Sequence, residues 1–290
     1  MPHPPVQVER FADAQAFLDA AGPFLADREA EHNLLFGIAA NLITDPDRPM
    51  PAPPYFAAFR EDDEVVAAAL MTPPFNVVVS CVDEPDAITV LAADLDRGRF
   101  PVPGITAPVD VARLFSERWA DRHGVMAERT MAERIYRVER VTKPDDVPGS
   151  MRMATHDDRS LLVEWVRDFL REAVHRTDDG ETKAVVDSAL RTGSRTFYLW
   201  EHDGRPVSLA GVTGPTPNGI RVGPVYTPPA DRRHGFASAV TAAVSQDQLD
   251  QGRRFVFLFT DIANPTSNKI YQAIGYEAVI DIDQWSFEPG

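Results

Sequence analysis

One stretch of sequence decides the fold: Val225-Tyr226-Thr227-Pro228-Pro229-Ala230-Asp231-Arg232-Arg233-His234-Gly235-Phe236-Ala237. Its two prolines end an extended segment, and a basic turn then leads into the start of a helix. Such a turn exposes successive backbone N–H groups at the positive end of the helix, which suits a pyrophosphate. Gly235 lets the backbone come close to a phosphate, and Arg232 and Arg233 add positive charge. Taken alone, these residues fit an ordinary strand-to-helix loop equally well.

The segments around this turn alternate between strands and helices. In the second half, the sequence predicts strands over residues 196–201, 206–213, 220–227, 254–259 and 278–287, and helices after Thr155 and over 182–191, 237–251 and 267–274. In the first half, helical periodicity covers 11–43, 85–95 and 108–123, and strands are predicted over 55–60, 65–70, 77–82 and 133–141. Both halves follow one order of helices, hairpin, strand, helix and strand. We therefore expect an α+β protein with two copies of one unit.

The two copies are predicted to meet at a polar segment rich in proline, Lys143-Pro144-Asp145-Asp146-Val147-Pro148-Gly149. Prolines, a glycine and charges are typical of a linker between domains. The predicted domains are therefore residues 1–146 and 147–290.

A second motif follows farther along the chain: Asn264-Pro265-Thr266-Ser267-Asn268-Lys269-Ile270-Tyr271-Gln272-Ala273-Ile274-Gly275-Tyr276. Together the two motifs resemble the GNAT superfamily of acetyl-CoA-dependent N-acetyltransferases. The segments Val-Tyr-Thr-Pro-Pro and Asn-Pro-Thr-Ser-Asn resemble a branch of predicted bacterial acetyltransferases. The family's first signature, a strand followed by Arg/Gln-x-x-Gly-x-Gly/Ala, is matched by Arg232, Gly235 and Ala237. Its Asn…Tyr…Gly-Phe/Tyr ending is matched by the second motif. The resemblance covers about residues 150–288, and it implies tandem GNAT-like domains, each a mixed, mostly antiparallel sheet flanked by helices.

The resemblance implies acetyl-CoA as the co-substrate and a role for each matched residue. Backbone N–H groups from Arg233 to Ala237 would hold the pyrophosphate, and the main chain of Val225 and Thr227 would pair with the pantetheine arm. The Thr227 N–H would polarise the thioester carbonyl, and Asn264 would bind the pantetheine. The implied cofactor-binding set is Val225, Tyr226, Thr227, Arg232, Arg233, His234, Gly235, Phe236, Ala237, Asn264, Asn268 and Tyr271.

Tyr271 corresponds to the tyrosine that often protonates the leaving thiolate in this family, so we expect a general acid there rather than a packing residue. The base is less well defined. Asp261, just past a strand, or Glu201, at the end of an earlier one, would serve directly or through a water, although a turn cap or a solvated carboxylate is the more ordinary interpretation of each. His234 is expected to neighbour a phosphate. The expected reaction is direct attack of a primary amine, since no Ser/His/Asp or Cys/His set is visible.

The first half lacks the acetyl-CoA signature. The basic turn before the predicted helix, from Pro228 to Gly235, is called the phosphate turn. We take Phe100–Pro108 as the equivalent loop of the first half; it holds one glycine, Gly104, and no arginine after Arg99. The first domain is therefore predicted to be a degenerate copy that has lost cofactor binding. It would serve as a structural unit or as a wall of the acceptor pocket.

Composition limits the partners. The formal net charge of −15 argues against nucleic acid, whose phosphates need a basic surface, and suits cationic amines, although solubility alone also explains it. The single cysteine, Cys81, lies in an apolar stretch and is expected to be buried and inert, and the histidines lack ligand spacing, so no metal is expected. Because neither a membrane-spanning run nor a secretory signal is visible, we expect a cytoplasmic protein.

The acceptor is left open as a small-molecule or peptide amine, and the oligomeric state as a monomer or a homodimer. Two other functions remain possible alternatives: an aminoacyl-tRNA-dependent transferase, a class that also pairs GNAT-like domains, and a non-catalytic acyl-CoA-binding protein. The acidic charge and the intact turn weigh against the first. Consumption of thioester with a panel of amines separates the second.

Overall fold

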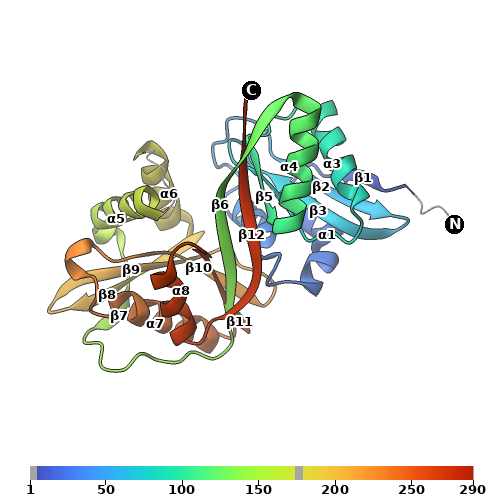
Figure 1. Cartoon of the computed structure of the whole chain (residues 1–290). Coiled ribbons are helices and arrows are strands. Elements are labelled where there is room, and N and C mark those ends of the chain that lie inside the picture. Colours follow the sequence, from blue (N-terminus) through green and yellow to red (C-terminus); the bar gives the residue numbers. More distant parts are fainter. Residues whose placement is uncertain (1–4, 174–178, 290) are drawn as a thin grey trace. The chain divides into compact units, whose positions relative to one another are not determined.

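The computed structural model describes residues 5–173 and 179–289 (Figure 1). Its elements, in chain order, are β1 (Gln7–Arg10), α1 (Ala14–Asp27), α2 (Asn33–Thr44), β2 (Tyr55–Glu61), β3 (Glu64–Met71), β4 (Val77–Val79), α3 (Asp86–Arg97), β5 (Gly104–Pro108), α4 (Val109–His123), β6 (Val125–Val138), β7 (Ser150–Met153), η1 (His156–Asp158), α5 (Arg159–Ala173), α6 (Asp179–Thr192), β8 (Arg195–His202), β9 (Arg205–Thr213), β10 (Gly219–Tyr226), η2 (Pro229–Asp231), α7 (Phe236–Asp250), β11 (Phe255–Asp261), α8 (Pro265–Ala273) and β12 (Glu277–Pro289).

The chain forms two compact units. The first unit comprises Met1–Ile135, Thr260–Asn264 and Ala278–Gly290, and the second comprises Tyr136–Phe259 and Pro265–Glu277. These units differ from a simple division at residue 146, because almost all of β12 belongs to the first unit and the segment after Ile135 belongs to the second.

A sheet with the strand order β1-β2-β3-β4-β5-β12-β6 forms the centre of the first unit. β4 and β5 are parallel, whereas β1, β2, β3 and β4 pair with one another in antiparallel fashion, as do β5 and β12. Side chains alternate along β2. Tyr55, Ala57 and Phe59 pack with α3 and α4, whereas Phe56 and Ala58 pack with α1 and α2. Helices therefore cover both faces of this sheet.

The second unit repeats this arrangement with the strand order β11-β10-β9-β8-β7. β10 and β11 are parallel, and the other neighbours are antiparallel. Along β8, Phe197 and Leu199 pack with α5 and α6, whereas Tyr198 and Trp200 pack with α7. The expected α+β class, with a mixed and mostly antiparallel sheet flanked by helices in each half, is confirmed.

The structure corrects one expectation about the first half, where Phe100–Pro108 is predicted as a loop. Gly104–Pro108 is instead β5, which pairs with β12 on one side and β4 on the other. Gly104 is needed for close approach: a Cβ there would lie 1.9 Å from the backbone oxygen of Trp285. The glycine therefore marks contact between strands rather than a turn.

A helix that crosses a membrane must be both long and apolar. Within residues 5–173 and 179–289, no helix is both long and apolar enough to span a membrane.

Candidate active site

β10 and β11 lie side by side only at their beginnings. Their parallel pairing covers the pairs Gly219↔Phe255, Ile220↔Val256 and Arg221↔Phe257. Among the described residues, no further pairing joins the two strands, although β10 stays paired with β9 as far as Tyr226, with an irregular register between Val222 and Val225. The second parts of β10 and β11 therefore leave facing edges that an extended ligand can pair with.

The turn after β10 has the backbone shape that its sequence predicts. Arg233 and Gly235 both have positive φ angles, 67° and 81°, and α7 begins at Phe236. A Cβ at Gly235 would also meet the Val147 side chain at 2.9 Å. Conformation and close packing thus both favour glycine at this position.

The start of α7 presents unused hydrogen-bond donors. Ala239 N–H donates to the Gly235 carbonyl at 2.9 Å, which is the first regular bond of the helix. For the backbone N–H groups from Arg233 to Ser238, the described part of the chain supplies no acceptor. These donors lie at the positive end of the helix dipole, so the turn forms a site for an anion.

Buried contacts hold the turn in shape. Arg205 at the start of β9 donates to both carboxylate oxygens of buried Asp231, at 3.0 and 2.6 Å, and this contact lowers the pKa of Asp231. Phe236 is buried in the core beneath α7, and the rings of His202 and His234 lie 5.5 and 5.6 Å from its ring. His234 itself is exposed at the surface of the turn.

The two arginines of the turn differ in what they contact. Arg232 donates from Nε to the Thr227 carbonyl at 2.9 Å and from its terminal nitrogen to Glu172 at 2.6 Å. Arg233 is exposed, and no ion pair or hydrogen bond to its side chain occurs among residues 5–173 and 179–289. Of the two charges expected to serve an anion, Arg233 is therefore the available one, whereas Arg232, which is also exposed, contacts Thr227 and Glu172.

Tyr271 on α8 is half-buried, and its ring lies 6.1 Å from that of Tyr276 in an edge-on arrangement. Burial raises the pKa of Tyr271 to about 12. Because of this raised pKa, the phenol keeps its proton at neutral pH, and within the described residues its hydroxyl has no hydrogen-bond partner. Asn268, one turn earlier, instead accepts a hydrogen bond from buried Tyr136 at 3.0 Å.

The predicted bases are both engaged in local contacts. Asp261 accepts a hydrogen bond from Ala263 N–H at 2.8 Å, and its carbonyl accepts one from Asn264 N–H at 3.0 Å, so it caps the turn between β11 and α8. Glu201 accepts a hydrogen bond from Arg152 at 2.7 Å, and Arg152 also pairs with Asp158. The Glu201 carboxylate is therefore engaged in an ion pair.

Sequence reasoning missed two polar residues that contact this part of the second unit. Glu172 on α5 accepts from Arg232 and, at 3.4 Å, from the Tyr226 hydroxyl. Ser208 on β9 is fully buried and contacts the main chain of Tyr226 and the hydroxyl of Thr227. Neither residue has a sequence signal: Glu172 resembles any residue on the polar side of a helix, and Ser208 any small residue in a strand.

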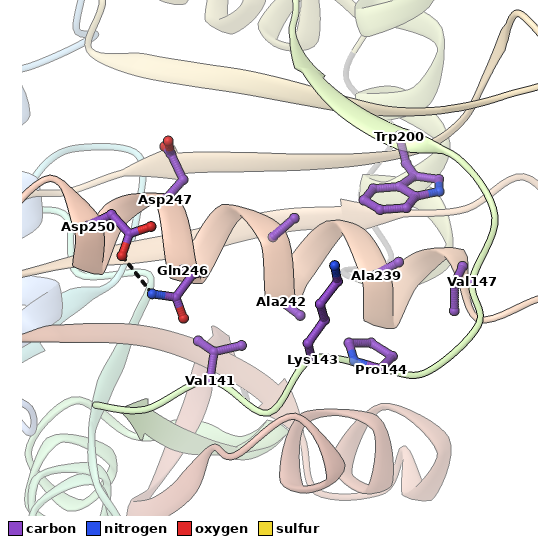
Figure 2. A pocket seen from close by; sticks show the side chains of 11 residues that line it. Val141, Lys143, Pro144, Val147, Trp200, Ala239, Ala242, Gln246, Asp247 and Asp250 are labelled. Carbon is purple, nitrogen blue, oxygen red and sulfur yellow. Dashed lines mark hydrogen bonds between the residues drawn. The ribbon is translucent and has the colours of Figure 1, made fainter.

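A cavity of about 360 Å³ lies elsewhere in the second unit, between α7 and the segment Val141–Val147 (Figure 2). Its wall includes Trp200 and alanines of α7, and the Lys143 side chain extends toward the helix. No residue of the phosphate turn lines it. It nevertheless adjoins the start of α7, because two residues of its wall, Val147 and Ala239, lie next to Gly235.

In the first unit, Glu31, His32 and Cys81 place one potential metal ligand each within 4.8 Å of one another. Both nitrogens of His32 are occupied, since Nδ1 contacts the Leu25 carbonyl at 3.0 Å and Nε2 accepts from Cys81 N–H at 3.1 Å. Burial, together with Glu31, raises the pKa of the Cys81 thiol to about 12. Both ring nitrogens of His32 are therefore used within the first unit.

The loop of the first unit that corresponds to the phosphate turn is Ser80–Pro85, not Phe100–Pro108 as predicted. β4 is antiparallel to β3 and parallel to β5, just as β10 is antiparallel to β9 and parallel to β11. The loop that follows β4 and enters α3 therefore takes the place of the turn. It contains no glycine or arginine and carries Asp83 and Glu84.

Comparisons with known proteins agree with this fold of two α+β units. Residues 204–286 match the family model described as FR47-like protein. No curated protein matches the sequence. Among solved structures, the chain is similar to a tandem GNAT protein from the clavulanic acid biosynthesis pathway, with 15% identity over 98% of this chain and 99% of that one and a TM-score of 0.60.

Two further solved structures are similar. A GCN5-related N-acetyltransferase from Sphaerobacter thermophilus is 15% identical over 97% of this chain and 95% of that one, with a TM-score of 0.57. Another, from Kribbella flavida, is 16% identical over 78% of this chain and 87% of that one, also with a TM-score of 0.57. The resemblance expected from the sequence is thus confirmed: the chain has the fold of a tandem GNAT protein and carries an FR47-like, GNAT-related segment over residues 204–286.

Proposed function

We propose that the second unit binds acetyl-CoA and transfers its acetyl group to a primary amine. The observation that carries this proposal is the run of unpaired backbone N–H groups from Arg233 to Ser238, in the turn that follows the strand that has parted from β11. Such donors suit a pyrophosphate, and a free strand edge suits an extended pantetheine arm. The pantetheine arm would therefore pair with the edge of β10, and the pyrophosphate would bind the turn that follows it.

Each residue of the turn has a place in this proposal. The N–H groups from Arg233 to Ala237 hold the pyrophosphate, with the exposed Arg233 side chain beside it and His234 as a neighbour. Val225, Tyr226 and Thr227 offer the strand edge. Asn264 binds the pantetheine, and Asn268 supports the same site from α8, where it also holds Tyr136.

The proposed chemistry is direct attack on the thioester. The amine nitrogen bonds to the acetyl carbonyl carbon while the Thr227 N–H stabilises the developing oxygen charge. The carbon–sulfur bond then breaks, and Tyr271 gives its phenolic proton to the leaving sulfur. The proton of the amine passes to Asp261, directly or through a water. The acidic chain, with its net charge of −15, favours cationic acceptors, and a single cysteine fits a reducing cytoplasm.

Two measurements test this function. Calorimetric titration with CoA is expected to show one site per chain, and a panel of primary amines is expected to contain at least one that releases thiol from acetyl-CoA. Dimethylated forms of the same amines serve as matched controls, because a tertiary amine has no proton to lose. Absence of CoA binding contradicts the proposal. Binding without thiol release for any amine favours a non-catalytic acyl-CoA-binding protein.

A further inference from the structure

The peptide before Thr227 is oriented by a buried side chain. Ser208, with no exposed surface, donates from Oγ to the Tyr226 carbonyl at 3.1 Å. The same Oγ lies 2.8 Å from Thr227 Oγ1. A serine hydroxyl has one hydrogen, so the Thr227 hydroxyl is the donor in this second contact.

This contact decides where the Thr227 N–H points. The peptide between Tyr226 and Thr227 is trans, and in a trans peptide the C=O and N–H point in opposite directions. Since the Tyr226 carbonyl points to Ser208 on β9, the Thr227 N–H points away from β9. On that side of β10 lies the edge that has parted from β11.

The peptide after Thr227 is held from the other direction. Its carbonyl accepts from Arg232 Nε at 2.9 Å, and Glu172 on α5 holds the same guanidinium at 2.6 Å. Arg232 also lies over the Tyr226 ring, 5.8 Å from its centre. The planar fork of arginine holds the carbonyl and the carboxylate in a fixed geometry, which the compact ammonium of a lysine does not reproduce.

We propose that Ser208 and the Arg232–Glu172 pair are positioning residues that clamp Thr227 and aim its N–H at the thioester carbonyl. The inference rests on the proposed function, in which that N–H is the donor to the carbonyl oxygen. In this inference Arg232 holds the end of β10 in place and does not bind the phosphates. A donor held in place before the reaction needs no reorganisation when charge develops on the oxygen.

The test compares the affinities for acetyl-CoA and CoA, which differ by the thioester carbonyl, and needs no acceptor. The wild type is expected to bind acetyl-CoA about fivefold more tightly than CoA, the effect of one hydrogen bond. Ser208→Ala is expected to bring this ratio close to one while changing the Kd for CoA less than about threefold. Glu172→Gln and Arg232→Lys are expected to change the ratio in the same direction.

Matched controls separate positioning from packing. Ser245 is a second fully buried serine in the same unit, and its Oγ likewise contacts a backbone carbonyl and a hydroxyl, each at 2.7 Å. Ser245→Ala, and Glu164→Gln on α5, are expected to keep the wild-type ratio. Where an acceptor is known, Ser208→Ala should also lower kcat by about 10- to 100-fold with little change in the KM for acetyl-CoA.

The outcomes are distinct. Failure of the wild type to bind either ligand contradicts the proposed function itself. A wild type that binds both equally, a Ser208→Ala protein that keeps the ratio, or equal effects of Ser208→Ala and Ser245→Ala overturn the clamp. A loss of more than about tenfold in affinity for both ligands in Arg232→Lys would show that this arginine serves the phosphates.

Discussion

Each unit joins a strand to a helix at the same place in its sheet, but the two loops treat their backbone donors differently. In Ser80–Pro85 of the first unit, Cys81 N–H donates to His32 and Asp83 N–H donates to the Val66 carbonyl. In the second unit, the N–H groups from Arg233 to Ser238 find no acceptor within the described residues. Acceptors on other segments of the first unit take these two donors of the first loop, whereas the second turn leaves its donors to solvent or a ligand.

The comparison teaches that topology does not decide whether such a loop binds an anion. Every buried N–H group needs an acceptor, and an acceptor from the chain takes the place of one from a ligand. Charge follows the same division, since Asp83 and Glu84 occupy the first loop and Arg232 and Arg233 the second. Cofactor binding in one unit and its loss in the other are therefore expected from hydrogen bonding and charge together.

Ala237→Glu should have the largest effect on this difference. Ala237 lies in the first turn of α7, where a carboxylate suits the helix dipole, so the fold should be kept. The same carboxylate would repel a pyrophosphate, and CoA affinity should fall at least about 100-fold by calorimetry. Gln246→Glu, an equal charge change on the exposed side of α7, should bind normally. If Ala237→Glu still bound CoA tightly, the CoA site would lie outside the turn, and the difference between the two loops would not explain cofactor binding.

Tyr271→Phe should have the next largest effect. The substitution keeps the ring but removes the proton, so kcat should fall at least about tenfold, within the range of general-acid catalysis. The KM for acetyl-CoA should change much less, because the pyrophosphate donors lie on another segment. Steady-state kinetics with an active amine measures both constants. A kcat within about twofold of wild type would make Tyr271 a packing residue and leave the proton to a water.

The effect of pH on the first unit should be smaller. Burial lowers the pKa of His32, whose neighbours are Arg28, Glu31 and Asp83, below its ordinary value of 6.5. The unfolded ring therefore takes up a proton before the folded one, so stability is complete above pH 6.5 and is lost as the pH falls below it. One group costs at most about 1.4 kcal/mol per pH unit.

Scanning calorimetry at pH 7.5 and 5.5 measures this effect. His32→Gln keeps an acceptor for Cys81 N–H without a titrating ring, so its Tm should depend less on pH than that of the wild type. CoA affinity at pH 7.5 should be the same in both proteins. Equal pH dependence of the two Tm values would show that another group titrates.

The phosphate turn could be predicted because its determinants are local. A glycine, a helix start and a run of basic residues are all visible within a few positions. In the structure Gly235 has a positive φ, and α7 begins next to it, at Phe236. The paired hairpin strands were predictable for a similar reason, since alternation along the chain reports burial on two faces.

The remaining features depend on contacts between distant segments. Gly104 signals a turn in sequence, yet it is a strand residue because Trp285 comes close to it from the far end of the chain. For the same reason Phe100–Pro108, which is predicted as the equivalent loop, ends in a strand instead. Ser208 matters only through Tyr226 and Thr227 on the next strand, and a serine within an apolar strand gives no sign of that contact.

The place of β12 has a consequence for how the protein is made. Ribosomes synthesise a chain from its N-terminus, and an N-terminal domain generally folds before the rest has emerged. Here the first unit lacks an interior strand, paired with β5 from Gly104 to Pro108, until the residues of β12 have been synthesised. Its sheet can be completed only after the second unit has been translated in full. A nascent chain halted at the linker would therefore expose the unpaired edge of β5. An exposed strand edge can pair with other chains, so the first unit depends on β12 for protection against aggregation.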